Sequence, residues 1–176
     1  MNYSVWKLVG ECIGLIAVIE GFFIYLSSKR ERILIFKFIS DFLWMLNHFC
    51  LGGYTGALLN LVAMGREAVF YNRDKRKFAK SSLWLYFFLV AVAISPLLSL
   101  VSGKEGWYAL LPAFGSMAAV IGFYSRYPNV TRYTSFVANG LWLAYNVIIS
   151  NYSATLSGVI LLLSALIGTV RSLRQK

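Results

Sequence analysis

Residues 38–60 read FISDFLWMLNHFCLGGYTGALLN, and residues 136–158 read FVANGLWLAYNVIISNYSATLSG. At a constant offset the two stretches share an aromatic start, a Leu-Trp pair, and a Tyr followed by a small hydroxyl residue. The matches are Phe38 with Phe136, Asp41 with Asn139, Leu43-Trp44 with Leu141-Trp142, Tyr54-Thr55 with Tyr152-Ser153, Leu58 with Leu156 and, further along, Arg73 with Arg171. Because matches of Trp, Tyr and Asp/Asn are not generic hydropathy, they indicate an internal repeat.

Long apolar stretches surround both copies. The chain has 176 residues, of which 59% are hydrophobic and 14% charged, whereas a soluble domain has about 45–50% apolar and about 25% charged residues. A membrane-spanning helix needs about 20 mainly apolar residues. Windows of that length predict helices at residues 5–27, 33–52, 54–72, 82–102, 106–125, 131–149 and 152–171. The sequence therefore predicts a single all-α membrane domain, residues 1–176, with seven transmembrane helices.

The repeat extends into the flanking helices, because residues 17–23 and 118–124 share Ala, Gly and Phe at one spacing. Residues 5–73 are thus a first three-helix repeat, residues 106–172 a second, and residues 82–102 a linker helix. Three helices per repeat would invert the second copy, and the linker helix restores its direction. We expect two parallel three-helix bundles related by an axis along the membrane normal, an arrangement found in transporters with a site at the repeat interface.

Basic residues predict the orientation, since Lys and Arg are retained on the cytoplasmic side of a membrane. They accumulate in alternate joints, at Lys29, Arg30, Arg32 and Lys37, from Arg73 to Lys80, at Arg126 and Arg132, and at Arg171, Arg174 and Lys176. The other side has only Lys7 and Lys104. We expect an outside N-terminus and a cytoplasmic C-terminus. The formal charge of +10 comes from these tracts and not from one folded face, so the bilayer is the expected partner and nucleic acid is not.

Three motifs carry a family resemblance: Asp41-x-x-Trp44-x-x-x-His48, Gly53-Tyr54-Thr55-Gly56-Ala57-Leu58-Leu59-Asn60, and Arg66 with Val69-Phe70-Tyr71. Over nearly the whole chain they resemble the YgjV family of bacterial inner-membrane proteins, which belongs to the superfamily of SWEET and SemiSWEET sugar transporters and PnuC vitamin transporters. The three-one-three plan and the tract Leu141-Trp142-Leu143-Ala144-Tyr145 resemble the same transporters. The resemblance implies a bacterial inner membrane and a small-molecule substrate.

The resemblance also implies a pocket. In SemiSWEETs a Trp on the second helix and an Asn sixteen residues later line the sugar pocket, and Trp44 and Asn60 match both residue types and the spacing. In the second half Trp142 matches, but Gly158 occupies the Asn position, so the pocket is expected to be asymmetric. The expected substrate-binding residues are two tryptophans that stack on a ring and three amides that bind its polar edge: Trp44, Trp142, Asn60, Asn139 and Asn146.

Ionisable residues fall inside the predicted helices of the first bundle, among them Glu11, Glu20, Asp41, His48, Arg66 and Glu67. A rise of about 1.5 Å per residue places Glu20, Asp41 and Arg66 at nearly one depth, with Glu67 beside Arg66. A charge near the bilayer centre costs about 2.5–3.5 kcal/mol and needs a partner or a purpose. Two interpretations stay open: ion pairs that hold the bundle together, or direct contact with substrate or protons.

The sequence has no HExxH, GxSxG or P-loop motif, so no enzymatic activity is expected. Its two cysteines, Cys12 and Cys50, lie in apolar segments, and its only histidine is His48. We therefore expect no disulfide, metal site or cofactor. The predicted function is a transporter or facilitator of a small polar metabolite, sugar-like or vitamin-like, that works by alternating access. A non-transporting sensor or accessory subunit is the alternative, and homo-oligomer formation stays open.

Overall fold

The computed structural model describes residues 3–26, 30–72, 75–124 and 128–174, and it is helical in every element there. Its seven α-helices are α1 (Tyr3–Leu26), α2 (Arg30–Cys50), α3 (Tyr54–Tyr71), α4 (Leu83–Val101), α5 (Leu110–Tyr124), α6 (Pro128–Ile148) and α7 (Tyr152–Arg174). Two short 3-10 helices, η1 (Lys77–Lys80) and η2 (Trp107–Ala109), lie between them. The seven predicted helices are confirmed, with bounds that differ by a few residues.

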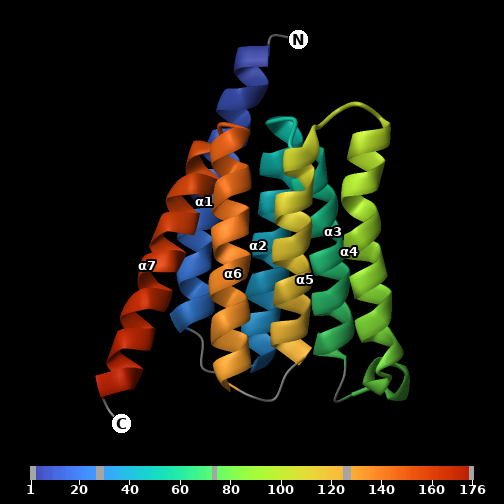
Figure 1. The fold of residues 1–176 in the computed structure, drawn as a ribbon, viewed down its shortest axis with the longest axis vertical. Coiled ribbons are helices and arrows are strands. Elements are labelled where there is room, and N and C mark those ends of the chain that lie inside the picture. The colour runs from blue at the N-terminus through green and yellow to red at the C-terminus, as the bar shows by residue number, and fades with distance from the viewer. Residues whose placement is uncertain (1–2, 27–29, 73–74, 125–127, 175–176) are drawn as a thin grey trace.

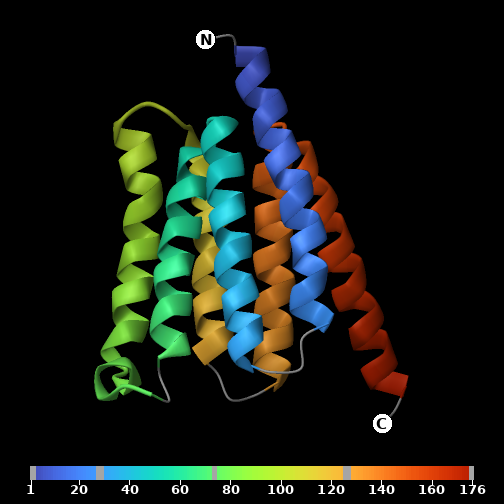
Figure 2. The ribbon, with the colours of Figure 1, turned by 180° about the vertical axis from the view of Figure 1, so that it is seen from behind.

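Successive helices alternate in direction along the long axis of the bundle (Figure 1). The start of α1 and the joints α2–α3, α4–α5 and α6–α7 lie at one end, which we call the N-terminal end. The ends of α3 and α7, together with η1, lie at the other, which we call the C-terminal end. Figures 1 and 2 both place α4 at one edge of the bundle and α1 with α7 at the opposite edge.

The helices pack in two sets. Helix α2 contacts both α1 and α3, and α6 contacts both α5 and α7, while contacts of α1 with α7 and of α3 with α5 join the sets. Helix α4 packs on α3 and α5. A small apolar core fills that junction, formed by Leu59, Phe88, Val92, Ala113 and Val120. The polar residues of α2, α3 and α6 therefore face one another beside this core.

The joints at the N-terminal end are tight. Helices α2 and α6 each end before a residue with positive φ, Gly52 at 77° and Ser150 at 54°. This conformation closes a helix by a hydrogen bond from the next backbone N–H to a carbonyl of the last turn. The two bonds are Gly53 N–H to His48 O at 2.8 Å and Asn151 N–H to Asn146 O at 2.9 Å. They fix where α3 and α7 begin.

Among the described residues, α4 is the one helix that is both long and apolar enough to cross a membrane on length and composition. Shorter apolar stretches cover Trp107–Gly122 and Tyr152–Leu163. Helices α2 and α3 carry buried polar and charged residues, which lower their hydropathy. That all seven helices cross the membrane stays a prediction, as does the orientation. Of the predicted basic tracts, Lys29, Arg73, Arg126 and Lys176 lie outside the described residues.

Candidate functional site

Two adjoining cavities lie among α2, α3, α4, α5, α6 and α7. The smaller, of about 130 Å³, is lined by Trp44, His48, Asn60, Asn139, Trp142, Leu143, Asn146, Ala154, Ser157, Gly158 and Leu161. The larger, of about 530 Å³, shares Asn60, Asn139, Trp142 and Leu161 with it. It also reaches Lys37 and Ser135, each about two turns from the helix start at the C-terminal end. Together the cavities form one space, with mainly apolar walls and a few polar and charged side chains, that extends toward that end.

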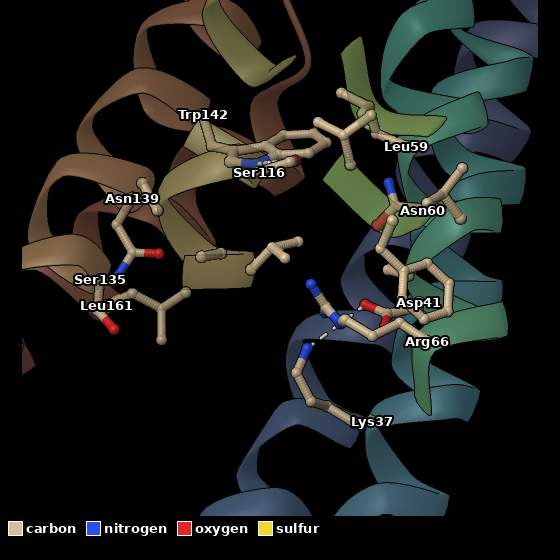
Figure 3. A pocket seen from close by; sticks show the side chains of 17 residues that line it. Lys37, Asp41, Leu59, Asn60, Arg66, Ser116, Ser135, Asn139, Trp142 and Leu161 are labelled. Atoms are coloured by element: carbon tan, nitrogen blue, oxygen red, sulfur yellow. Dashed lines mark hydrogen bonds and ion pairs between the residues drawn. The ribbon is translucent and has the colours of Figure 1, made fainter. Parts of the chain in front are cut away.

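The five residues predicted to bind substrate all line the smaller cavity: Trp44, Asn60, Asn139, Trp142 and Asn146. Figure 3 shows Asn60 on the wall formed by α2 and α3, and Asn139 and Trp142 on the opposite wall. Hydrogen bonds fix two of these side chains, because Trp142 Nε1–H donates to Ser116 Oγ at 3.2 Å and Asn60 Nδ2–H donates to Gly56 O at 2.8 Å. That these residues bind a substrate stays a prediction.

His48 is a central residue of this site that the predicted set lacked. It is 2% exposed, and its Nδ1 and Nε2 lie 2.8 Å from Trp44 O and 2.9 Å from Asn146 Oδ1. Its ring stacks on Tyr145 with 6.0 Å between centroids and meets the edge of Trp142 at 5.6 Å. A histidine on an apolar helix has no local pattern that distinguishes this role from simple packing, although it is the only histidine in the chain.

Among the residues that the structure describes, two ion pairs involve members of the predicted charge network. Arg66 Nη2 lies 3.0 Å from Glu67 Oε1, and both side chains are buried. Asp41 Oδ1 lies 3.6 Å from Lys37 Nζ, one helical turn earlier. Asp41, Arg66 and Lys37 all line the larger cavity, where Figure 3 shows them on the same wall as Asn60. The guanidinium and the carboxylates can therefore act both as internal partners and as groups that a solute in the cavity meets.

Glu20 and Lys37 both lie close to Asp41. Glu20 lies beside Ser40 and Asp41, and it is absent from the lining of both cavities. Lys37 had been counted with the basic tracts that set orientation. Its spacing of four residues from Asp41 is the signal that identifies it as a partner, because residues i and i+4 lie on one helix face.

Two glutamates close the N-terminal end by capping helices. Glu11 of α1 accepts hydrogen bonds from the backbone N–H groups of Tyr152 and Ser153, at 2.9 and 2.8 Å, where α7 begins. Glu105 accepts from the Thr55 N–H at 2.5 Å, where α3 begins, and from the Tyr145 hydroxyl at 2.7 Å. A carboxylate is favourable at a helix N-terminus because the first N–H groups lack partners and the helix dipole is positive there.

A lysine accompanies each cap. Lys7 Nζ lies 5.0 Å from the ring centroid of Tyr152, and Lys104 Nζ lies 4.4 Å from that of Tyr54, which are distances for cation–π attraction. Each of these tyrosines is the first residue of its helix. The same arrangement of carboxylate, helix start and lysine thus occurs twice at this end.

A buried amide cluster completes the closure. Asn47, fully buried, donates through Nδ2 to Gly10 O at 2.8 Å and to Ser153 Oγ at 3.3 Å. Its Oδ1 accepts from Asn151 Nδ2 at 2.6 Å, and Asn151 Oδ1 in turn accepts from the Ala154 N–H at 3.1 Å. These bonds join α1, α2 and α7, so helices from both sets are bonded to one another at the N-terminal end.

A chain whose described elements are all helical, with charged and amide side chains around an internal cavity and large apolar side chains on its outer faces, has features typical of an integral membrane protein. The chain belongs to the Imp-YgjV family of bacterial inner membrane proteins, whose family model matches residues 8–176. Neither a curated protein nor a solved structure shows a significant match to it.

Proposed function

We propose that the protein is a transporter or facilitator of a small polar metabolite, sugar-like or vitamin-like, in the bacterial inner membrane. The observation that carries the proposal is the convergence of Trp44, Asn60, Asn139, Trp142 and Asn146 from separate helices on one cavity. Cavities that combine apolar or aromatic walls with a few directed polar groups are typical of small-molecule sites. The larger cavity, of about 530 Å³, has room for a solute of this class.

Two features support alternating access between two three-helix bundles of the SWEET-like kind. Helices α1–α3 and α5–α7 each pack around a central helix, α2 or α6. Residues that correspond in the sequence repeat also meet across the bundles: His48 aligns with Asn146 at the offset that pairs Trp44 with Trp142, and the two side chains are hydrogen-bonded. Such contacts between equivalent residues are expected next to an axis that relates two halves.

The outer surface supports a membrane position for the whole bundle. Large apolar side chains are exposed along the outer helices, for example Leu8, Ile19, Phe87, Val90, Leu97, Phe136 and Val147. A patch of this extent on a soluble protein would be unusual. The helices apart from α5 have 18 to 24 residues, or roughly 27 to 36 Å, against a hydrocarbon thickness of about 30 Å.

The orientation can be tested with reporters. Since the basic tracts predict a cytoplasmic C-terminal end, a reporter fused at Lys176 and one inserted in residues 75–80 should both read cytoplasmic. A reporter inserted at Gly103, in the α4–α5 joint, should read external. Measurement of paired phosphatase and fluorescent fusions would decide this, and a single reversed site would contradict the seven-span topology.

With this orientation, we propose that the bonded N-terminal end is closed to the outside. The glutamate caps and the Asn47 cluster lie at the outer end, while the larger cavity reaches toward the cytoplasmic end through Lys37 and Ser135. Opening to the outside would require breaking these contacts, and closing the cytoplasmic end would bring the two walls of Figure 3 together.

Removal of the Trp44 side chain should abolish ligand binding with little loss of folding, because a half-buried aromatic on a cavity wall contributes more to a ligand than to helix packing. A thermal-shift screen of the purified protein against sugars, nucleosides and water-soluble vitamins identifies a ligand. Trp44→Ala should then weaken its binding at least tenfold, or by about 1.4 kcal/mol or more.

The matched control is Trp107→Ala, because Trp107 is 68% exposed and remote from both cavity linings. It should bind like the unmodified protein. Flux of the same ligand into proteoliposomes then separates the two functions: uptake that Trp44→Ala abolishes supports transport, whereas tight binding without flux supports the sensor or accessory alternative. Equal binding by both variants would contradict the site.

A further inference from the structure

His48 lies at the boundary between the sealed N-terminal end and the cavity. It lines the smaller cavity, and Gly56 of α3 and the rings of Trp142 and Tyr145 of α6 enclose it. It is the only histidine in the chain, and histidine is the side chain whose charge ordinarily changes between about pH 5 and 8.

The hydrogen bonds of the ring define its protonation. Nδ1 lies 2.8 Å from the carbonyl oxygen of Trp44, and Nε2 lies 2.9 Å from Oδ1 of Asn146. The two closest partners are oxygens that only accept, so both ring nitrogens must carry a hydrogen for both of these bonds to form, while the Asn60 Nδ2 group, a donor, lies farther from Nδ1, at 3.5 Å. A neutral imidazole has one N–H and one bare nitrogen. The arrangement in the structure therefore suits the imidazolium cation.

We propose that His48 is a proton-binding site of the transporter, and that its proton determines which polar group of Asn146 faces the substrate cavity. The inference rests on the proposed function, because it assigns a coupling proton to the same cavity. When Nε2 is protonated, Asn146 turns Oδ1 to the ring and Nδ2, a donor, toward the cavity. When Nε2 loses its proton to water in the cavity, the amide rotates so that Nδ2–H donates to Nε2 and Oδ1, an acceptor, faces the cavity.

Rotation of the Asn146 amide couples proton binding at His48 to substrate binding in the cavity. A solute that presents a hydrogen-bond acceptor to Asn146, such as a carbonyl oxygen or a ring nitrogen, binds better to the protonated site, because the neutral site offers it only another acceptor. Linkage is reciprocal, so the bound solute raises the affinity of His48 for its proton by the same factor. The predicted class of substrate is therefore a polar ring with an acceptor edge.

The residues around His48 can stabilise its positively charged imidazolium form. The face of Tyr145 lies parallel to the His48 ring within 17°, at 6.0 Å, and aromatic faces attract cations. The Tyr145 hydroxyl donates to Glu105, which places a carboxylate one side chain beyond the ring. Of the other charged groups, Asp41 and Arg66 line the adjoining cavity rather than the His48 ring. On α3 the groups facing the ring are Gly56 and the Asn60 amide.

Nitrogen-15 NMR of the full chain in lipid bilayers tests the proposal without any substrate. Because His48 is the only histidine, histidine labelling gives one pair of ring signals. Between about pH 8 and 5, we expect a change from one protonated and one bare nitrogen to two protonated nitrogens. A ring that keeps one protonation state over this range would overturn the proposal.

The role of Asn146 has its own test. Asn146→Asp gives the imidazolium a permanent anionic acceptor, and it should move the midpoint of the His48 titration up by about one pH unit or more, a tenfold change in proton affinity. Asn139→Asp introduces the same charge in the same cavity without a hydrogen bond to His48, and it should move the midpoint less. Equal shifts of the His48 titration midpoint in the two variants would overturn the proposed role of the Asn146 amide. A normal titration without flux of any solute would instead refute the transport function alone.

Discussion

Arg66→Ala is expected to destabilise the protein by about 3 to 5 kcal/mol, the usual cost of breaking a buried ion pair by removing one partner. Arg66 is 6% exposed and Glu67 is 4% exposed, and both Nε and Nη2 of Arg66 donate to Glu67 Oε1, at 3.3 and 3.0 Å. Without the guanidinium, the carboxylate of Glu67 is left buried with no compensating charge. Thermal unfolding in detergent measures the loss.

Lys37→Ala is the matched control, because it removes a cation from the other pair of the same cavity. Lys37 is partly exposed and 3.6 Å from the buried Asp41, but the charge of Arg66 still acts on that carboxylate, so the loss of Lys37 should cost less than the loss of Arg66. Equal costs for the two variants would contradict a structural role that depends on burial. If Arg66→Ala instead folds normally and loses flux, Arg66 is a substrate ligand.

Gly56→Ala should cost about 1 to 3 kcal/mol, the range for an atom forced into a packed interior. A Cβ at Gly56 would overlap His48 Cδ2 and lie only 2.9 Å from Cγ and 3.0 Å from Nε2. The imidazole cannot move away freely, because the rings of Trp142 and Tyr145 lie on its other sides. The variant should therefore lower the melting temperature and shift the His48 ring signals together.

Gly140→Ala provides the comparison, since a Cβ at Gly140 meets no atom within 4 Å. It lies inside α6, where alanine favours a helix by up to about 1 kcal/mol. Its melting temperature should stay level or rise. If Gly56→Ala behaves in the same way, the His48 ring is not held as the structure describes.

The helices could be predicted from the sequence because hydropathy windows locate apolar segments well. Their ends could not be placed as accurately. Helix α2 begins at Arg30, three residues before the predicted start, because charged residues end an apolar window without ending backbone hydrogen bonding. The 3-10 helices η1 and η2 were also missed, since one turn has no periodicity.

Trp44 and Asn60 were predicted to line a pocket from the residue types and the spacing of a motif that this sequence resembles, and both line the smaller cavity. The contacts of Glu11 and Glu105 could not be foreseen in this way. Each carboxylate caps a helix that starts at least 50 residues away along the chain. Only the packed arrangement of the helices brings such groups together, and no local pattern in the sequence encodes it.

The cap that Glu11 forms on α7 affects how the protein folds while it is being synthesised. Glu11 and Tyr152 are separated by 141 residues along the chain. Helix α1 can therefore contact the backbone that it caps only after α7 has been synthesised. At roughly 5 to 20 residues per second, that interval is about 7 to 28 s. During this time the Glu11 carboxylate has no backbone N–H of α7 to cap, and a chain truncated before α7 never acquires this contact.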